Sequence, residues 1–107
     1  MTTRKTYMKD SLLKNLIHKH KGLENAISTN QICTQFNEWG KPINARSLPQ
    51  IIKRLRYERG LPICYKRGKG YFWAKTKQDI FTTIEDLQNQ IYALHTTINF
   101  MKGFILE

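Results

Sequence analysis

Apolar side chains recur at alternating steps of four and three residues over the last quarter of this 107-residue sequence. Such a heptad spacing, held over more than three repeats, places the apolar positions on one stripe of an α-helix. The stripe comprises Ile80, Ile84, Leu87, Ile91, Leu94, Ile98, Met101 and Ile105. Residues 76–79 have the composition of a helix cap. The sequence therefore predicts one long helix that runs from this cap toward the C-terminus.

The length of this stripe indicates that the helix associates with another helix. Its apolar positions extend over about 37 Å at ~1.5 Å per residue. A domain built from the rest of so short a chain offers too little surface to cover them. We therefore expect self-association through Ile84, Leu87, Ile91, Leu94, Ile98, Met101 and Ile105.

The residue types along the stripe leave the geometry of this association open. Isoleucine at the first apolar position with leucine at the second favours a parallel homodimer. The flanking positions offer no charge pairs that would fix a direction, and Tyr92, Phe100 and Phe104 widen the apolar face. An antiparallel pair, a bundle of more than two helices, and packing against the first helix of the chain therefore remain as alternatives.

The positive charge of the chain is concentrated in its middle third. Lysine and arginine number 18 against 8 aspartates and glutamates, which gives a formal net charge of +10. Residues 41–77 contain eleven of these basic residues and a single acid, Glu58, whereas the net charges of 1–40 and 78–107 cancel. A localised basic surface is typical of proteins that bind a polyanion.

The composition argues against several classes of protein. No apolar run is long enough to span a membrane, and the N-terminus lacks the pattern of a secretory signal. Cys33 and Cys64 have 30 residues between them, which favours a reduced cytoplasmic location and a packing role for both. His18 and His20 face different sides of a helix, so we expect no metal site and no cofactor. No catalytic motif is present, and we expect no enzyme activity.

Residues 1–75 are expected to form one small domain, whose residues 1–9 are a basic N-terminal arm. Residues 76–107 are expected to form a separate C-terminal dimerisation helix. A first helix should follow the arm to about Lys21 and stop at Gly22. After a short extended link at 26–28, a second helix should begin at a Ser-x-x-Gln capping box. The residues expected to face inward are Leu12, Leu13, Leu16, Ile17, Ile32, Cys33, Phe36 and Trp39.

A third helix is predicted after the turn at 41–44. Ser47 and Gln50 have the form of a second capping box, which keeps Pro49 in the first turn, where proline is tolerated. Asn44 is also a good cap, but a helix that starts there would have Pro49 at its fifth position, where proline costs a hydrogen bond. We therefore favour Ser47 as the start of the regular helix, with an irregular turn before it. Two strands joined by the basic tip at 66–70 should follow. The inward residues of the third helix are Leu48, Ile51, Ile52 and Leu55.

This order of elements resembles that of the winged helix-turn-helix family. The resemblance covers residues 8–75 and rests on the element order, the basic hairpin and the helix spacing. In length and composition the chain also resembles small winged-helix proteins encoded by bacteriophages and related mobile elements. The resemblance implies a mainly α fold with a small β-hairpin, followed by a long helix of the coiled-coil type. It also implies that the third helix enters the major groove of DNA while the hairpin tip reaches the flanking backbone.

The polar residues of the third helix have the chemistry that base edges require. Arg46 or Ser47, then Gln50, then Arg54 follow one another at three- and four-residue steps. Arginine pairs with guanine and glutamine with adenine, whereas Lys53 and Arg56 are suited to phosphates. The alternative to a DNA-binding role is that these residues only form a basic, solvent-exposed face of the helix. The candidate DNA-binding residues are Asn44, Arg46, Ser47, Gln50, Lys53, Arg54, Tyr57, Lys66, Arg67 and Lys69.

Together these features predict a sequence-specific, double-stranded DNA-binding protein that is dimeric through its last helix and regulates transcription in a bacterial cytoplasm. An origin-binding or accessory factor in replication would use the same surface. An alternative from a different class is a protein-interaction module, such as an inhibitor or adaptor that binds an acidic host protein through the basic face.

Overall fold

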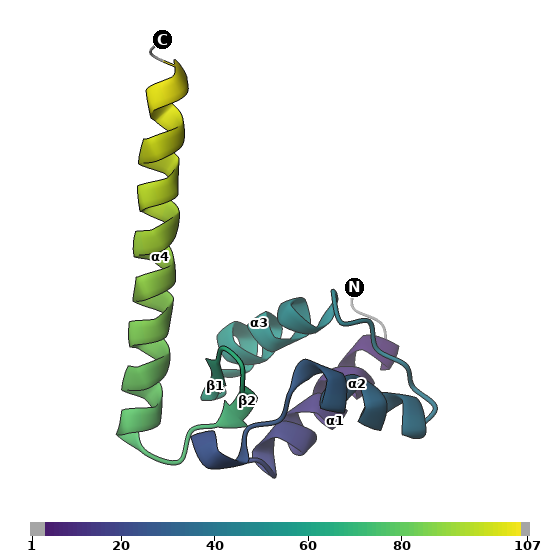
Figure 1. Cartoon of the computed structure of the whole chain (residues 1–107). Helices are drawn as coiled ribbons and strands as arrows, with labels where there is room; N and C mark the ends of the chain where they lie inside the picture. Colours follow the sequence, from purple (N-terminus) through teal and green to yellow (C-terminus); the bar gives the residue numbers. More distant parts are fainter. Residues whose placement is uncertain (1–3, 106–107) are drawn as a thin grey trace.

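The computed structural model describes residues 4–105, with side chains from residue 8 onward. It is mainly helical, with one two-stranded antiparallel sheet and a long C-terminal helix, as the sequence predicted. Figure 1 shows helices packed together with the hairpin, and the long C-terminal helix rising beside them. The elements are α1 (Arg4–His18), the short 3-10 helix η1 (Leu23–Asn25), α2 (Thr29–Glu38), α3 (Leu48–Arg59), β1 (Ile63–Lys66), β2 (Gly70–Trp73) and α4 (Lys77–Ile105).

The core lies where α1, α2 and α3 meet the hairpin. Its fully buried side chains belong to all three helices and to β2, and they are Leu13, Ile17, Ile32, Phe36, Leu48, Ile52, Leu55 and Phe72. These positions confirm the inward faces predicted from helical spacing. Trp39 is an exception, because it caps the C-terminus of α2 and is 38% exposed. Its ring packs edge-on against Phe36, with 5.2 Å between ring centroids, instead of entering the core.

The hairpin is widened by a third segment of chain. β1 and β2 pair in antiparallel register from Ile63 opposite Trp73 to Lys66 opposite Gly70. Ile27, in the predicted extended link, exchanges two backbone hydrogen bonds of 2.8 Å with Tyr71. Gly70 has a φ of +116°, and a Cβ at this position would overlap the carbonyl oxygen of Ile27. The close approach of the two segments therefore requires glycine at position 70.

The limits of α1 differ from the prediction at both ends. The helix includes Arg4 to Lys9, which were predicted to belong to the basic arm before it, while residues 1–3 of that arm lie outside the described part of the chain. The helix ends at His18 instead of continuing to Lys21. The backbone beyond it is bonded to β2, because Trp73 donates to the His20 carbonyl (2.8 Å) and Gly22 donates to the Trp73 carbonyl (2.9 Å).

Local capping sets the starts of the other three helices. The predicted capping box between Ser28 and Gln31 is present at the start of α2. At α4, the backbone N–H groups of Thr76 and Asp79 each donate to the other residue's side chain at 3.3 Å. These interactions satisfy N–H groups that the first turn of a helix leaves without partners.

The start of α3 is capped differently from the prediction. The regular helix begins at Leu48 after an irregular turn, as expected, but the predicted capping box at Ser47 is wrong, because the Ser47 side chain makes no capping hydrogen bond. Instead, the Asn44 side chain accepts from the Arg46 N–H at 2.8 Å, and the Asn44 carbonyl accepts from the N–H groups of Ser47 and Leu48. Asn44 is therefore the residue that organises this turn.

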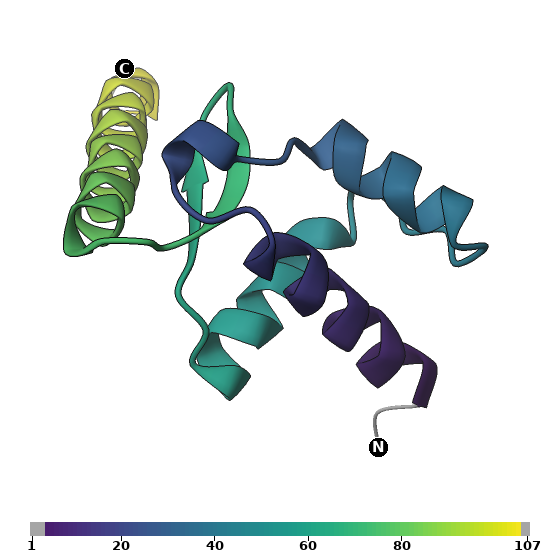
Figure 2. The same ribbon diagram turned by 90° about the horizontal axis from the view of Figure 1, so that it is seen from below.

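The last helix runs beside β1 and then leaves the domain. It contacts the hairpin through its first turns, and every residue from Ile91 to Ile105 is exposed. In the view of Figure 2, α1 to α3 and the hairpin all lie to one side of α4. The alternative in which this helix packs back along α1 is therefore wrong for residues 91–105. No helix in the described part of the chain has the length and apolar character needed to cross a membrane.

Candidate nucleic-acid interface

One face of α3 is solvent-exposed along its whole length. Leu48, Ile51, Ile52 and Leu55 occupy the buried face. On the opposite side, at steps of four, three and four residues, lie Arg46, Gln50, Lys53 and Tyr57. All four are exposed, and Tyr57 reaches 77%. We call these four residues the α3 stripe. The structure thus brings together four of the predicted DNA-binding residues on one surface.

Arg54 lies on the flank of α3 and not in the α3 stripe. Its Nη2 and Nε atoms donate to the two carboxylate oxygens of Asp10 in α1, at 2.9 and 3.3 Å. The Asp10 side chain is 6% exposed and that of Arg54 is 32% exposed. The hydrogen bond to Asp10 raises the pKa of the Arg54 guanidinium, so this side chain is held charged within the fold. A base contact by Arg54 stays a prediction. However, the Nε and Nη2 groups of its guanidinium, which could take part in such a contact, already donate to Asp10.

The remaining predicted residues of this region have local roles. Asn44 caps the turn before α3, as described above, and Ser47 is exposed at the end of that turn. Arg56 lies on the other flank of α3, where its Nε donates to the carbonyl of Ile63 in β1 at 2.8 Å. Its guanidinium therefore faces the hairpin and α4, and not the surface formed by the α3 stripe.

The hairpin tip presents two exposed cations and one paired cation. Arg67 and Lys69 are exposed in the turn, which is closed by a 2.9 Å hydrogen bond from the Lys69 N–H to the Lys66 carbonyl. Lys66 is half-buried, and its Nζ lies 3.5 Å from the Asp86 carboxylate of α4. Gly68 adopts a φ of +83°, which allows the tight turn. Of the three predicted tip residues, Arg67 and Lys69 are therefore the ones presented to solvent.

The sequence did not predict that the start of α2 lies beside the hairpin tip. Ser28, Thr29 and Asn30 line a shallow hollow of about 240 Å³ together with Lys69 and the flanking glycines of the hairpin tip. No spacing within the sequence indicates this neighbourhood. It is created by the pairing of Ile27 with Tyr71, which is a contact between segments more than 40 residues apart.

The heptad residues of α4 lie beside the domain-facing side of the helix and are not buried by the domain, although Leu87 also lines a cleft with α3 and the hairpin. The side of α4 that contacts the domain contains Thr83, which is buried, and the half-buried Asp79, Asp86 and Gln90. At 3.6 residues per turn, the heptad stripe lies about a quarter of a turn from this side. The exposed fraction of its side chains ranges from 41% at Ile80 to 81% at Ile105. The apolar stripe is therefore an uncovered surface of the single chain.

The histidines and cysteines that the sequence analysis considered have packing roles in the fold. The His18 ring packs edge-on against Trp73, and His20 Nδ1 lies 2.8 Å from the Asn25 carbonyl. Cys64 is a buried free thiol whose pKa is raised by burial, and Cys33 is half-buried and free. Among the described residues, no three His, Cys, Asp or Glu side chains are grouped so that they would hold a metal ion.

The chain matches no family model, no curated protein and no solved structure.

Proposed function

We propose that this protein binds double-stranded DNA sequence-specifically through a winged helix-turn-helix domain. The arrangement of α2, a turn and α3, followed by a hairpin whose outer edge pairs with the segment before α2, supports this assignment. In such a domain α3 is the helix that enters the major groove, and the hairpin is the wing that reaches the neighbouring backbone.

The observation that carries the proposal is the α3 stripe. Arg46 lies in the turn just before α3 and Gln50 in the first turn of the helix, close to the end of a recognition helix that contacts base edges. Their side chains suit guanine and adenine respectively. Lys53 and Tyr57 continue the same face and suit phosphate contacts, which fix the register of the protein on DNA. Since these four side chains are exposed, they are available to DNA without rearrangement of the core.

The hairpin tip supplies the second contact. Arg67 and Lys69 are two exposed cations beside the start of α2. Cations at such a tip neutralise phosphates and release counterions, which contributes affinity for every sequence. We therefore assign affinity to the tip and sequence preference to Arg46 and Gln50.

We further propose that α4 joins two copies of the chain into a homodimer through the heptad stripe. The heptad stripe is separate from the domain-facing side of α4, and this separation supports the proposed dimer. The helix can contact its own domain and a second copy of the chain at the same time. A dimer would present two α3 helices to two half-sites with a fixed spacing. The protein would then act as a transcriptional regulator in a bacterial cytoplasm, encoded by a bacteriophage or a related element. A replication factor would use the same two contacts.

The test of DNA binding is the salt dependence of affinity for a duplex of mixed sequence, followed by fluorescence anisotropy. We expect log Kd to rise linearly with log salt, and the double variant Arg67→Gln/Lys69→Gln to reduce that slope by about 2. Lys19→Gln/Lys21→Gln, which removes the same charge from exposed positions after α1, is the matched control and should change the slope less. Binding that does not respond to salt would contradict the proposal and favour a protein-interaction module.

A further inference from the structure

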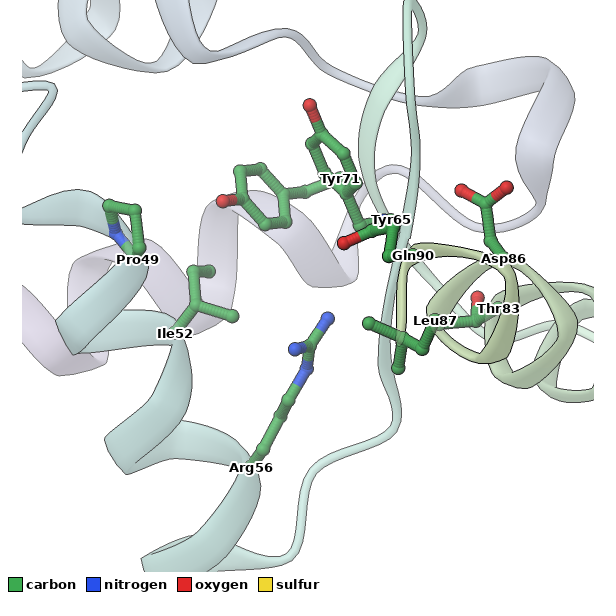
Figure 3. A pocket seen from close by; sticks show the side chains of 9 residues that line it. All are labelled: Pro49, Ile52, Arg56, Tyr65, Tyr71, Thr83, Asp86, Leu87 and Gln90. Carbon is green, nitrogen blue, oxygen red and sulfur yellow. The ribbon is translucent and has the colours of Figure 1, made fainter. Parts of the chain in front are cut away.

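A cleft lies between α3, the hairpin and α4 (Figure 3), and the proposed DNA contacts do not use it. Its volume is about 170 Å³. The walls come from all three elements, so the cleft forms where the proposed reading helix meets the proposed dimerisation helix. The residues that define its chemistry are Ile52, Arg56, Tyr65, Tyr71, Leu87 and Gln90.

The lining of this cleft includes hydrogen-bond donors that have no partner among the described residues. The guanidinium of Arg56 reaches in between Ile52 and Leu87 toward the two tyrosine rings (Figure 3). Its Nε is held by the Ile63 carbonyl, while its Nη groups have no hydrogen-bond partner among the described residues. Tyr71 is only 8% exposed, and its hydroxyl also has no partner among them. No side-chain polar atom among the described residues is both fully buried and without a partner, so these donors are accessible from the cleft and open to a ligand.

The charges around the cleft favour an anion. Its only carboxylate is Asp86, which lies 3.5 Å from Lys66 Nζ and is balanced by that ammonium. Arg56 is the only other charged group in the lining. Burial raises the pKa of Tyr71, so its hydroxyl stays protonated and able to donate at neutral pH. A carboxylate is the group that accepts most strongly from the free Nη groups of an arginine.

The remaining walls are apolar and limit the size of the ligand. Pro49, Ile52 and Leu87 line the cleft together with the rings of Tyr65 and Tyr71. These two rings lie 4.8 Å apart by their centroids. Such walls suit a flat apolar body, and the volume is below that of sites for drug-sized molecules. The occupant is therefore a small molecule and not a peptide or a DNA strand.

We propose that this cleft is a binding site for a small organic carboxylate with a flat apolar body, held by Arg56 and Tyr71 between α3 and α4. Because the ligand would contact both helices, its binding would change the DNA affinity of the protein. That regulatory consequence rests on the proposed DNA-binding function, whereas the binding site itself does not.

The probe for the site is benzoate, with benzamide and benzylamine as neutral and cationic analogues of the same shape. Titration into the ¹⁵N-labelled full chain is followed by amide shifts in two-dimensional NMR. We expect benzoate to bind with a Kd of about 1 mM, as befits so small a ligand, and to shift residues of the cleft on both α3 and α4. Equal binding of benzamide, shifts outside the cleft, or no shifts with any of the probes would overturn the proposal.

Single-residue variants test the assigned contacts. Tyr71→Phe removes only the hydroxyl and should weaken benzoate binding severalfold. Arg56→Gln should abolish the preference for benzoate over benzamide, whereas Arg59→Gln, an exposed arginine of α3 outside the cleft, should leave it unchanged. Unchanged preference in Arg56→Gln would contradict the assigned carboxylate contact. Circular dichroism of each variant checks that the fold is intact.

A second titration separates this proposal from the proposed function. Benzoate is added to the protein with a bound duplex, at constant ionic strength, and anisotropy is recorded. If benzoate binds in the cleft but no duplex binds under any condition, the site stands and the proposed DNA-binding function fails. If both bind and benzoate leaves the affinity for DNA unchanged, the regulatory consequence is wrong.

Discussion

Asp10 of α1 and Arg54 of α3 form a two-pronged ion pair, 44 residues apart in the sequence, that fixes how α3 is rotated against the domain. The carboxylate is almost fully buried, and the guanidinium covers it from the flank of α3. With Arg54 anchored on this side, the α3 stripe is turned to solvent. The pair therefore connects the packing of α1 to the presentation of the proposed DNA contacts.

Breaking this pair should destabilise the fold. Asp10→Asn leaves a charged guanidinium beside a neutral amide in a mostly buried site. We expect a loss of about 1–3 kcal/mol in the free energy of unfolding, below the range for a fully buried pair because Arg54 is partly exposed. Urea denaturation measures this loss. Glu85→Gln, at an exposed position of α4, is the control, and an equal loss in both variants would contradict the assigned role.

The two glycines of the hairpin should respond differently to alanine. Gly68 and Gly70 both have positive φ, so each substitution introduces backbone strain. Only at Gly70 would the added Cβ also meet the backbone of Ile27, whereas the space around Gly68 is open. We expect Gly70→Ala to cost about 2–4 kcal/mol and Gly68→Ala about 1 kcal/mol. Thermal denaturation compares them, and similar midpoints would show that Ile27 does not pack against the hairpin as described.

Gln50 and Arg54 should affect DNA binding in different ways. Gln50→Ala removes a side chain of the α3 stripe and should reduce discrimination at one base position by about 1–3 kcal/mol without changing stability. Arg54→Ala should lower the stability and weaken binding to all sequences alike, because it acts through the orientation of α3. Affinities for single-base variants of a preferred duplex measure both effects. Loss of discrimination at one base in Arg54→Ala, with normal stability, would instead make Arg54 a direct base contact.

The apolar stripe of α4 should account for self-association. Ile91→Asp places a charge within the stripe and should convert a dimer into a monomer, while the fold of the N-terminal domain is kept. Thr96→Asp introduces the same charge at an exposed position on the opposite side of α4. Light scattering at micromolar concentration gives the mass of each protein. A monomeric mass for the unsubstituted chain would contradict the proposed dimer.

Features that depend on neighbouring residues were predictable from the sequence. The heptad predicted α4, and the Ser-x-x-Gln pattern predicted the start of α2, because spacing and capping act within one or two turns. Leu48, Ile51, Ile52 and Leu55 were assigned to the core for the same reason. The periodicity of α3 correctly separated its buried face from its polar faces.

Features that depend on distant contacts were not predictable in this way. Arg54 was expected in the exposed stripe because nothing near it in sequence indicates Asp10 as a partner. A signal was present in α1, where Asp10 falls on the apolar side with Leu13 and Ile17 at helical spacing, and a buried acid requires a cation. The early end of α1 likewise depends on hydrogen bonds to Trp73, more than 50 residues away.

Selection from a pool of random duplexes tests most directly the proposal that the protein binds DNA by sequence, with Arg46 and Gln50 of the α3 stripe as the source of its sequence preference. The full chain is incubated with the pool, bound duplexes are recovered over several rounds and sequenced, and the Gln50→Ala variant is carried in parallel. We expect enrichment of one short motif, repeated at a fixed spacing if the protein is a dimer, with preference reduced at one position per half-site in the variant. Recovery of duplexes without any enriched motif would contradict sequence-specific binding.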